Sequence, residues 1–297
     1  MALKWTISVA AAAMAVGIAV PAPAAPIIFS VGGSADPASI QGTVDSFRAA
    51  LGSPNNGNSP GPIVGGRREI NWDGGGNNFT TTAPVTPFNV FLNTRGAQFT
   101  TPGTGLTQAP PSADPAAFPP GGLAGLFGNP TYGTTFGTFS PERLFAPVGS
   151  NVTDGLFFIP GTAGANPAAV TGFGAVFTDV DLADTTEIAF FGIHGNLIFQ
   201  AFVPVGTTDD GSLSFLGVFF DAGELITRVR ITTGNTALGP NDDPDGGIDV
   251  VAMDDFLYSE PLAVPEPGSL TLFVLGLGLL FLSVPTRRRR AMALHGR

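Results

Sequence analysis

The chain has 297 residues, of which 43% are hydrophobic and 12% charged, and its formal net charge is −10. It contains no cysteine, which excludes disulfide scaffolds, thiolate metal sites and cysteine nucleophiles. Its only lysine is Lys4, and five of its arginines lie in the last eleven residues, so the part between the two ends is strongly acidic. A surface of this sign repels phosphate backbones, which argues against nucleic-acid binding.

Residues 1–24 have the pattern of a secretory signal peptide. Lys4 supplies a positive charge, residues 5–20 form an apolar run, and Ala22-Pro23-Ala24 is a small-x-small cleavage site. We therefore expect signal peptidase to cut after Ala24 and the rest of the chain to be exported across the inner membrane. The alternative is an N-terminal membrane anchor, which the short run and the proline after it disfavour.

A single amphipathic helix is predicted over residues 37–51. Asp36-Pro37 provides an N-cap acid followed by a proline in the first turn. Apolar residues then recur at helical spacing, and Gly52 stands where a C-cap glycine is expected. The apolar residues are Ile40, Val44, Phe47 and Leu51.

The rest of the domain, which we place at residues 25–262, is predicted to be all-β. Short strands are expected over 63–72, 88–95 and 97–101, followed by a long irregular Pro/Gly loop over 102–131. The clearest strand patterns fall between residues 173 and 258, where six apolar or alternating segments are separated by turns. We expect an antiparallel, jelly-roll-like β-sandwich with a phenylalanine-rich core.

The C-terminal tail combines three features in a fixed order. Val264-Pro265-Glu266-Pro267 is followed by an apolar segment at 269–284 and then by Arg287, Arg288, Arg289 and Arg290. The apolar segment predicts a short transmembrane helix of about 24 Å, less than the roughly 30 Å hydrocarbon core. Arginines directly after a span stay in the cytoplasm, which places the domain on the outer side.

This tail, over residues 263–291, resembles the PEP-CTERM sorting signal of exported proteins in Gram-negative bacteria. The resemblance implies recognition by exosortase, an inner-membrane enzyme, with cleavage near Pro265-Glu266-Pro267 and release to the cell surface or exterior. It also implies transient anchoring in the inner membrane and a bacterium that makes exopolysaccharide. An ordinary single-pass anchor is the alternative.

A calcium loop is the strongest candidate for a ligand site within the domain. Asn241, Asp243, Asp245 and Gly246 match the first six positions of a D-x-D-x-D-G loop, and Asp249 falls at the ninth. The acid expected at the twelfth position is missing. The alternative is a solvated acidic hairpin loop.

Other acids at strand ends are expected to supply the missing calcium ligands. One pair follows the strand near residue 178, and the other lies in the strand near residue 254. Calcium prefers six to eight oxygen ligands, so convergence of these segments is required. The candidate ligands are Asn241, Asp243, Asp245, Asp249, Asp179, Asp181, Asp254 and Asp255.

Catalytic patterns are weak in this sequence. Glu69 and Asp73 share one strand face and flank Trp72, an aromatic that could stack on a sugar, so a glycan-active hydrolase is one hypothesis. His194 is interpreted as a surface histidine in a hairpin turn. The favoured expectation is a non-enzymatic exported surface or matrix protein associated with exopolysaccharide and biofilm, and a purely structural spacer is the third hypothesis.

Overall fold

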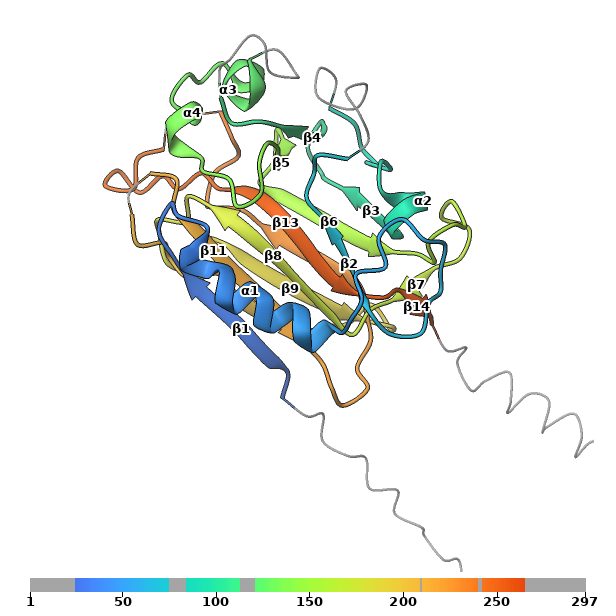
Figure 1. Ribbon diagram of the computed structural model, residues 1–297. Helices are drawn as coiled ribbons and strands as arrows, with labels where there is room; N and C mark the ends of the chain where they lie inside the picture. Colours follow the sequence, from blue (N-terminus) through green and yellow to red (C-terminus); the bar gives the residue numbers. More distant parts are fainter. Residues whose placement is uncertain (1–24, 75–83, 113–120, 209, 240–241, 265–297) are drawn as a thin grey trace, which may run out of the picture.

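The computed structural model describes residues 25–74, 84–112, 121–208, 210–239 and 242–264, and these residues are mostly β, as expected (Figure 1). The strands pair in antiparallel fashion. The larger sheet has the order β1 (Ile27–Gly32), β11 (Leu213–Phe219), β8 (Gly172–Thr178), β13 (Ala252–Ser259), β5 (Leu144–Val148) and β4 (Gly105–Ala109), and β2 (Arg67–Ile70) also pairs with β13.

A five-stranded sheet packs against this larger sheet. Its order is β10 (Leu197–Phe202), β9 (Glu187–Gly192), β12 (Ile226–Thr232), β6 (Val152–Phe157) and β3 (Ala97–Thr100). One hydrophobic cluster holds buried residues of both sheets, including Phe173 and Phe256 of the larger sheet and Phe190 and Val229 of the smaller one. The two sheets therefore share one core. A separate small ladder joins β7 (Ala168–Ala169) to β14 (Leu262–Ala263).

Helix α1 (Ala38–Leu51) covers the other face of the larger sheet. Its four buried residues are the four predicted from helical spacing, so the expected helix is confirmed. Phe47 lies directly on the sheet, because β8 and β11 carry glycines beneath it: a Cβ added at Gly217 or Gly174 would approach the Phe47 ring to 2.8 Å. The central strands β8, β11 and β13 are therefore covered on both faces.

The segment 102–131 is more ordered than predicted. Residues Gly105–Ala109 form β4, which is buried along its whole length, and α3 (Gly122–Phe127) follows, with α4 (Tyr132–Thr135) directly after it. These helices, β4 and β5 share a second apolar cluster that includes Leu123, Tyr132 and Leu144. The expectation of an irregular loop is wrong here. The sequence does not predict β4 because Thr107 and Gln108, although buried, interrupt its apolar pattern.

The strand predictions differ from the structure in other places. The six strands expected between residues 173 and 258 are present as β8 to β13, whereas β1, β5 and β6 were not predicted. Residues 88–95 do not form a strand: Phe88 makes a single bridge to Phe99, and Leu92–Arg95 form the short helix α2. Gly96 ends this helix in the left-handed conformation with φ 71°, which glycine adopts without strain.

Both ends of the described domain lie at the same end of the larger sheet. Ile27 pairs with Phe219, and Phe219 pairs with Gly172. At the opposite end Thr178 pairs with both Leu213 and Ala252. Strand β14 closes the described chain beside the first of these ends. No helix among the described residues is long and apolar enough to cross a bilayer, and the predicted signal peptide and the apolar segment 269–284 lie outside the described residues.

A buried ion pair fastens β2 to the end of β13. Arg68 is 0% exposed and Glu260 is 3% exposed. The guanidinium of Arg68 donates to both carboxylate oxygens of Glu260, with Nε–Oε2 2.6 Å and Nη2–Oε1 2.7 Å. The same two side chains also hold the loop between α1 and β2, through Gly57 O, Ser59 O, Asn56 Nδ2 and Ile63 N.

We predict that Glu260→Gln lowers the free energy of unfolding by about 3–5 kcal/mol, because it leaves the Arg68 charge buried and unpaired. Urea unfolding followed by circular dichroism measures the loss. Glu142→Gln changes an exposed side chain and is the control, with an effect within about 0.5 kcal/mol. The double variant Arg68→Met/Glu260→Leu is expected to recover most of the loss, and a single-variant cost below about 1 kcal/mol would contradict the prediction.

Candidate functional site

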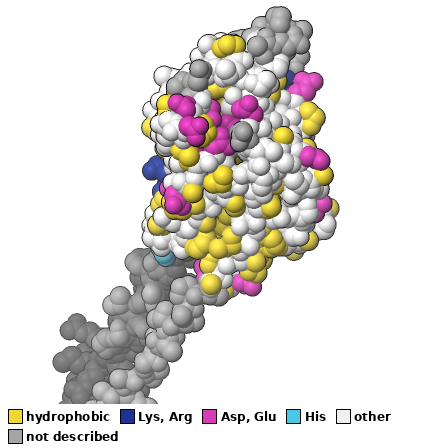
Figure 2. All heavy atoms as spheres, turned by 90° about the vertical axis from the view of Figure 1, so that its left-hand side faces the viewer, with side chains coloured by type: hydrophobic (Ala, Val, Ile, Leu, Met, Phe, Trp, Pro, Cys, Tyr) yellow, Lys and Arg dark blue, Asp and Glu magenta, His cyan; other side chains and the backbone are white. Residues whose placement is uncertain are grey.

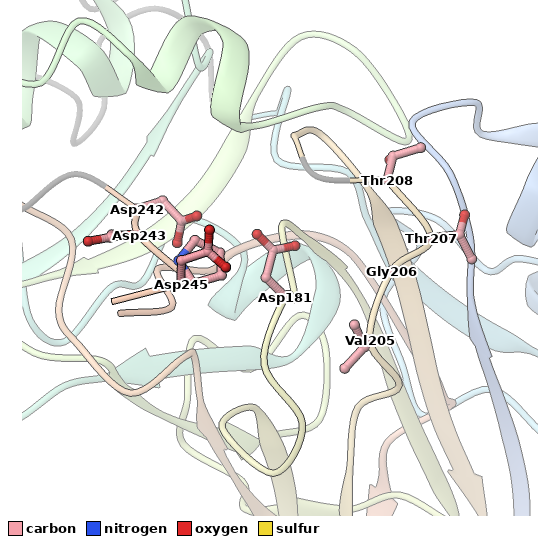
Figure 3. Close-up of a pocket in the computed structure, with 9 residues that line it drawn as sticks. Asp181, Val205, Gly206, Thr207, Thr208, Asp242, Asp243 and Asp245 are labelled. Atoms are coloured by element: carbon pink, nitrogen blue, oxygen red, sulfur yellow. The ribbon is translucent and has the colours of Figure 1, made fainter. Parts of the chain in front are cut away.

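A cavity of about 550 Å³ opens at the end of the larger sheet that lies opposite the two ends of the described domain. Acidic side chains gather around a hollow on this side of the molecule (Figure 2). Two loops and the segment after β10 form its wall, as Figure 3 shows. The lining residues are Asp181, Val205, Gly206, Thr207, Thr208, Asp242, Asp243, Pro244 and Asp245.

Three carboxylates converge beside this cavity, and two of them, those of Asp181 and Asp242, line it. Asp179 and Asp181 follow the end of β8, and Asp242 lies in the connection between β12 and β13. One carboxylate oxygen from each residue lies within 4.8 Å of the other two. In Figure 3, Asp181 lies between the loop that carries Asp242 and the segment from Val205 to Thr208. We refer to Asp179, Asp181 and Asp242 as the carboxylate cluster.

Asp179 is the buried member of the cluster, with 0% of its surface exposed. Its Oδ1 accepts a hydrogen bond of 3.2 Å from the Gly211 N–H, whereas its Oδ2 is buried and has no hydrogen-bond partner. Burial, followed by the charges of Asp181 and Asp242, raises the pKa of Asp179 to about 9. The fold thus holds a carboxyl group where its ionised form is strongly disfavoured.

Asp242 and Asp181 are positioned by backbone contacts. Asp242 Oδ1 accepts a hydrogen bond from the Val250 N–H at 3.1 Å, and burial and then the charge of Asp249 raise the pKa of Asp242, against the hydrogen bonds from Val250 and Asp181. The backbone N–H of Asp181 donates to Asp249 Oδ1 at 3.2 Å. Asp249 is itself buried and accepts a hydrogen bond from Thr185 Oγ1. Asp249 therefore holds the backbone of Asp181 in place beside the cluster.

The predicted calcium loop does not fold around a central point. Asp243 Oδ1 accepts a hydrogen bond from the Gly246 N–H at 3.0 Å, and the backbone of Asp243 pairs with Ile248, so this side chain caps its own turn. Asp245 is exposed at the cavity wall. Asn241 lies outside the described residues. The loop contributes Asp242 to the cluster, a residue that the spacing motif passes over.

Asp254 and Asp255 do not join the carboxylate cluster. Asp254 Oδ2 accepts a hydrogen bond from the Phe139 N–H at 2.6 Å, and Asp255 Oδ1 accepts one from Ser140 Oγ at 2.5 Å. Both side chains are buried, and Asp255 also lies 3.8 Å from an Nη2 of Arg48. Burial raises the pKa of both carboxyl groups, which share one site at an irregularity in β13. Both side chains therefore make contacts that stabilise the fold.

Glu69 and Asp73 are held apart in separate contacts. Glu69 forms ion pairs with Arg48 at 3.0 Å and with Arg67 at 2.6 Å. Asp73 Oδ1 accepts hydrogen bonds from the backbone N–H groups of residues 142 and 143 at 2.9 and 3.1 Å. Both carboxylates are thus committed to contacts within the fold.

Trp72 is not available for stacking on a sugar. It is 0% exposed, its ring lies 3.8 Å from that of Phe145 with an angle of 2° between the planes, and its Nε1 donates to Asp254 O at 2.7 Å. The expected role of this residue beside Glu69 and Asp73 is therefore wrong. Trp72 is a core residue whose indole N–H donates to a buried backbone oxygen.

We predict that Trp72 fluorescence is insensitive to solvent and to sugars. After removal of residues 1–24, Trp72 is the only tryptophan in the chain. Its emission should be blue-shifted, resist quenching by iodide and remain unchanged on titration with oligosaccharides, because the ring is fully packed. Free tryptophan under the same conditions is the control. Strong iodide quenching of the folded protein would contradict this placement.

The remaining sequence candidates lie at the surface or outside the described residues. His194 is exposed in the turn between β9 and β10, where Gly195 N–H donates to Gly192 O. Val264 is the last described residue, and Pro265, Glu266, Pro267 and Arg287 to Arg290 lie outside the described part. No protein-family model, curated protein or solved structure matches the chain.

Proposed function

We propose that this chain is an exported, non-enzymatic surface or extracellular-matrix protein that is sorted by exosortase. The observation that carries the proposal is the C-terminal order of a Pro-Glu-Pro triplet, a short apolar segment and four arginines. Signal peptidase would remove residues 1–24, and exosortase would cut near Glu266. The inner membrane would hold the protein only transiently, through residues 269–284.

The boundaries of the described domain support this processing. Strand β1 begins at Ile27, after the proposed first cut, and β14 ends at Ala263, before the triplet. Both cuts therefore fall outside the strands of the domain and would leave its core complete. The processed domain would keep seven arginines against 22 acids, which makes it a highly anionic module.

We infer that the domain is a β-sandwich of jelly-roll type. Two antiparallel sheets share one phenylalanine-rich core, and this arrangement is the one that a sandwich requires. Such a domain offers a rigid body that can contact exopolysaccharide in a biofilm. A hydrolase based on Glu69 and Asp73 has less support, because both carboxylates are occupied and Trp72 is buried.

Mass spectrometry of the intact mature protein tests the sorting proposal. In wild-type cells the mature chain should begin near Ala25 and end near Glu266. In a strain without exosortase, or in the variant Glu266→Ala, the chain should keep Arg287 to Arg290. Glu142→Ala, an exposed change inside the domain, should be processed normally. A mature wild-type protein that retains the arginines would refute sorting by exosortase.

Co-sedimentation with exopolysaccharide distinguishes a matrix protein from a spacer. The processed protein is expected to sediment with polysaccharide purified from the producing cells and to leave its sugar chains uncut. A spacer would stay in the supernatant. Release of reducing ends that is lost in Glu69→Gln would instead favour the hydrolase.

A further inference from the structure

We propose that the carboxylate cluster of Asp179, Asp181 and Asp242 binds a divalent cation, and that this cation is calcium. The cluster brings together the loop after β8 and a loop more than sixty residues further along the chain, with oxygens from all three residues within 4.8 Å of one another. This site differs from the D-x-D-x-D-G motif, since it uses Asp242 and leaves Asp243 in its own turn. The inference is independent of how the protein is sorted.

The unpartnered oxygen of Asp179 is the observation that points to a ligand. Buried polar atoms in folded proteins nearly always have a hydrogen-bond partner, and an unsatisfied one is costly. Asp179 is fully buried, yet its Oδ2 has no partner among the described residues. The same residue contributes an oxygen to the cluster. A cation bound between the three carboxylates would satisfy this side chain.

The surroundings of the cluster are also acidic. Two further acids lie close to its three members: Asp249, which accepts a hydrogen bond from the Asp181 N–H, and Asp210, which interacts electrostatically with both Asp179 and Asp242. The arginines with described ion pairs are engaged elsewhere: Arg48 and Arg67 with Glu69, Arg68 with Glu260, and Arg228 and Arg230 with Asp154. A bound divalent ion stabilises several carboxylates that are held together in a partly buried site.

The donor set selects a hard cation. All three candidate side chains offer oxygen, the chain has no cysteine, and His194 lies in the distant β9–β10 turn. Oxygen-only sites suit calcium or magnesium rather than zinc or copper. Magnesium demands a near-ideal octahedron, whereas calcium accepts irregular sites and completes six to eight ligands with water. A cavity of about 550 Å³ beside the cluster leaves room for that water, so calcium fits better.

The bound ion would add a second link between two loops that the hydrogen bond from the Asp181 N–H to Asp249 already joins. Asp181 and Asp242 both line the cavity, one on each loop. Few protein ligands and an open side predict weak binding, with a Kd of about 10⁻⁴ M, at the tight end of the range of extracellular calcium modules. Calcium would thus stiffen the cavity wall at extracellular concentrations.

Thermal unfolding of the full-length chain in mild detergent tests the proposal. In about 10 mM calcium the Tm is expected to be roughly 5–10 °C higher than in EDTA, because the ion binds only the folded state. Titration calorimetry with calcium chloride should give one site. No Tm shift and no binding heat in the wild-type protein would overturn the proposal. An equal shift with magnesium would overturn the assignment to calcium.

Three variants locate the ion. Asp179→Asn removes a buried acid from among other acids, so its Tm in EDTA should exceed that of the wild-type protein while its calcium shift is lost. Asp242→Asn should lose the shift as well. Asp184→Asn, an exposed change in the same loop as Asp181, is the matched control and should keep the full shift.

A fourth variant separates the cluster from the spacing motif. Asp245→Asn changes a motif position that lies outside the carboxylate cluster, so the calcium shift should persist. If Asp245→Asn abolishes the shift while Asp179→Asn and Asp242→Asn retain it, the ion binds the motif loop and the proposed site is wrong. A shift retained in Asp179→Asn alone would equally contradict the role of the buried carboxylate.

Discussion

The buried pair of Arg68 and Glu260 is the contact on which the organisation of the domain depends. Its two residues are separated by 192 positions in the chain, and neither charge is tolerable in the core without the other. Because Arg68 also donates to backbone oxygens at Gly57 and Ser59, the pair helps to fix the glycine- and proline-rich loop, which is also joined to β2 by a bridge between Asn55 and Arg67. One ion pair thus joins the first third of the chain to the end of the last long strand.

An element could be predicted from the sequence where its buried positions are filled by apolar residues. Helix α1 has one apolar stripe and clear end signals, and its limits follow from the sequence. Strand β8 is buried at every residue and appears as a continuous apolar run. Strand β4 is equally buried but contains Thr107 and Gln108, whose burial depends on neighbours that the sequence does not reveal. In residues 88–95, alternating apolar residues imitate a strand, and tertiary packing selects a bridge and a helical turn instead.

The acidic site was predictable only in part, because spacing within one loop does not show which distant segments it will meet. Spacing within one loop suggests ligands at alternate positions of 241–249, and the acids after β8 were expected to complete them. It could not indicate that Asp243 would cap its own turn, or that Asp242 would come within 4.8 Å of Asp179 and Asp181. Likewise Trp72 beside two acids resembles a sugar-binding pattern, and only the packing of Phe145 against it reveals a core residue. Convergence between distant segments is a property of the fold, not of local spacing.

The first and last strands of the described domain lie at the end of the larger sheet that is opposite the cavity. Ile27 and β14 lie at one end of the larger sheet, and the cavity with its carboxylate cluster lies at the other, about seven residues or roughly 23 Å along the strands. A molecule attached to any support through the residues after Val264 would present its acidic end outward, away from the support.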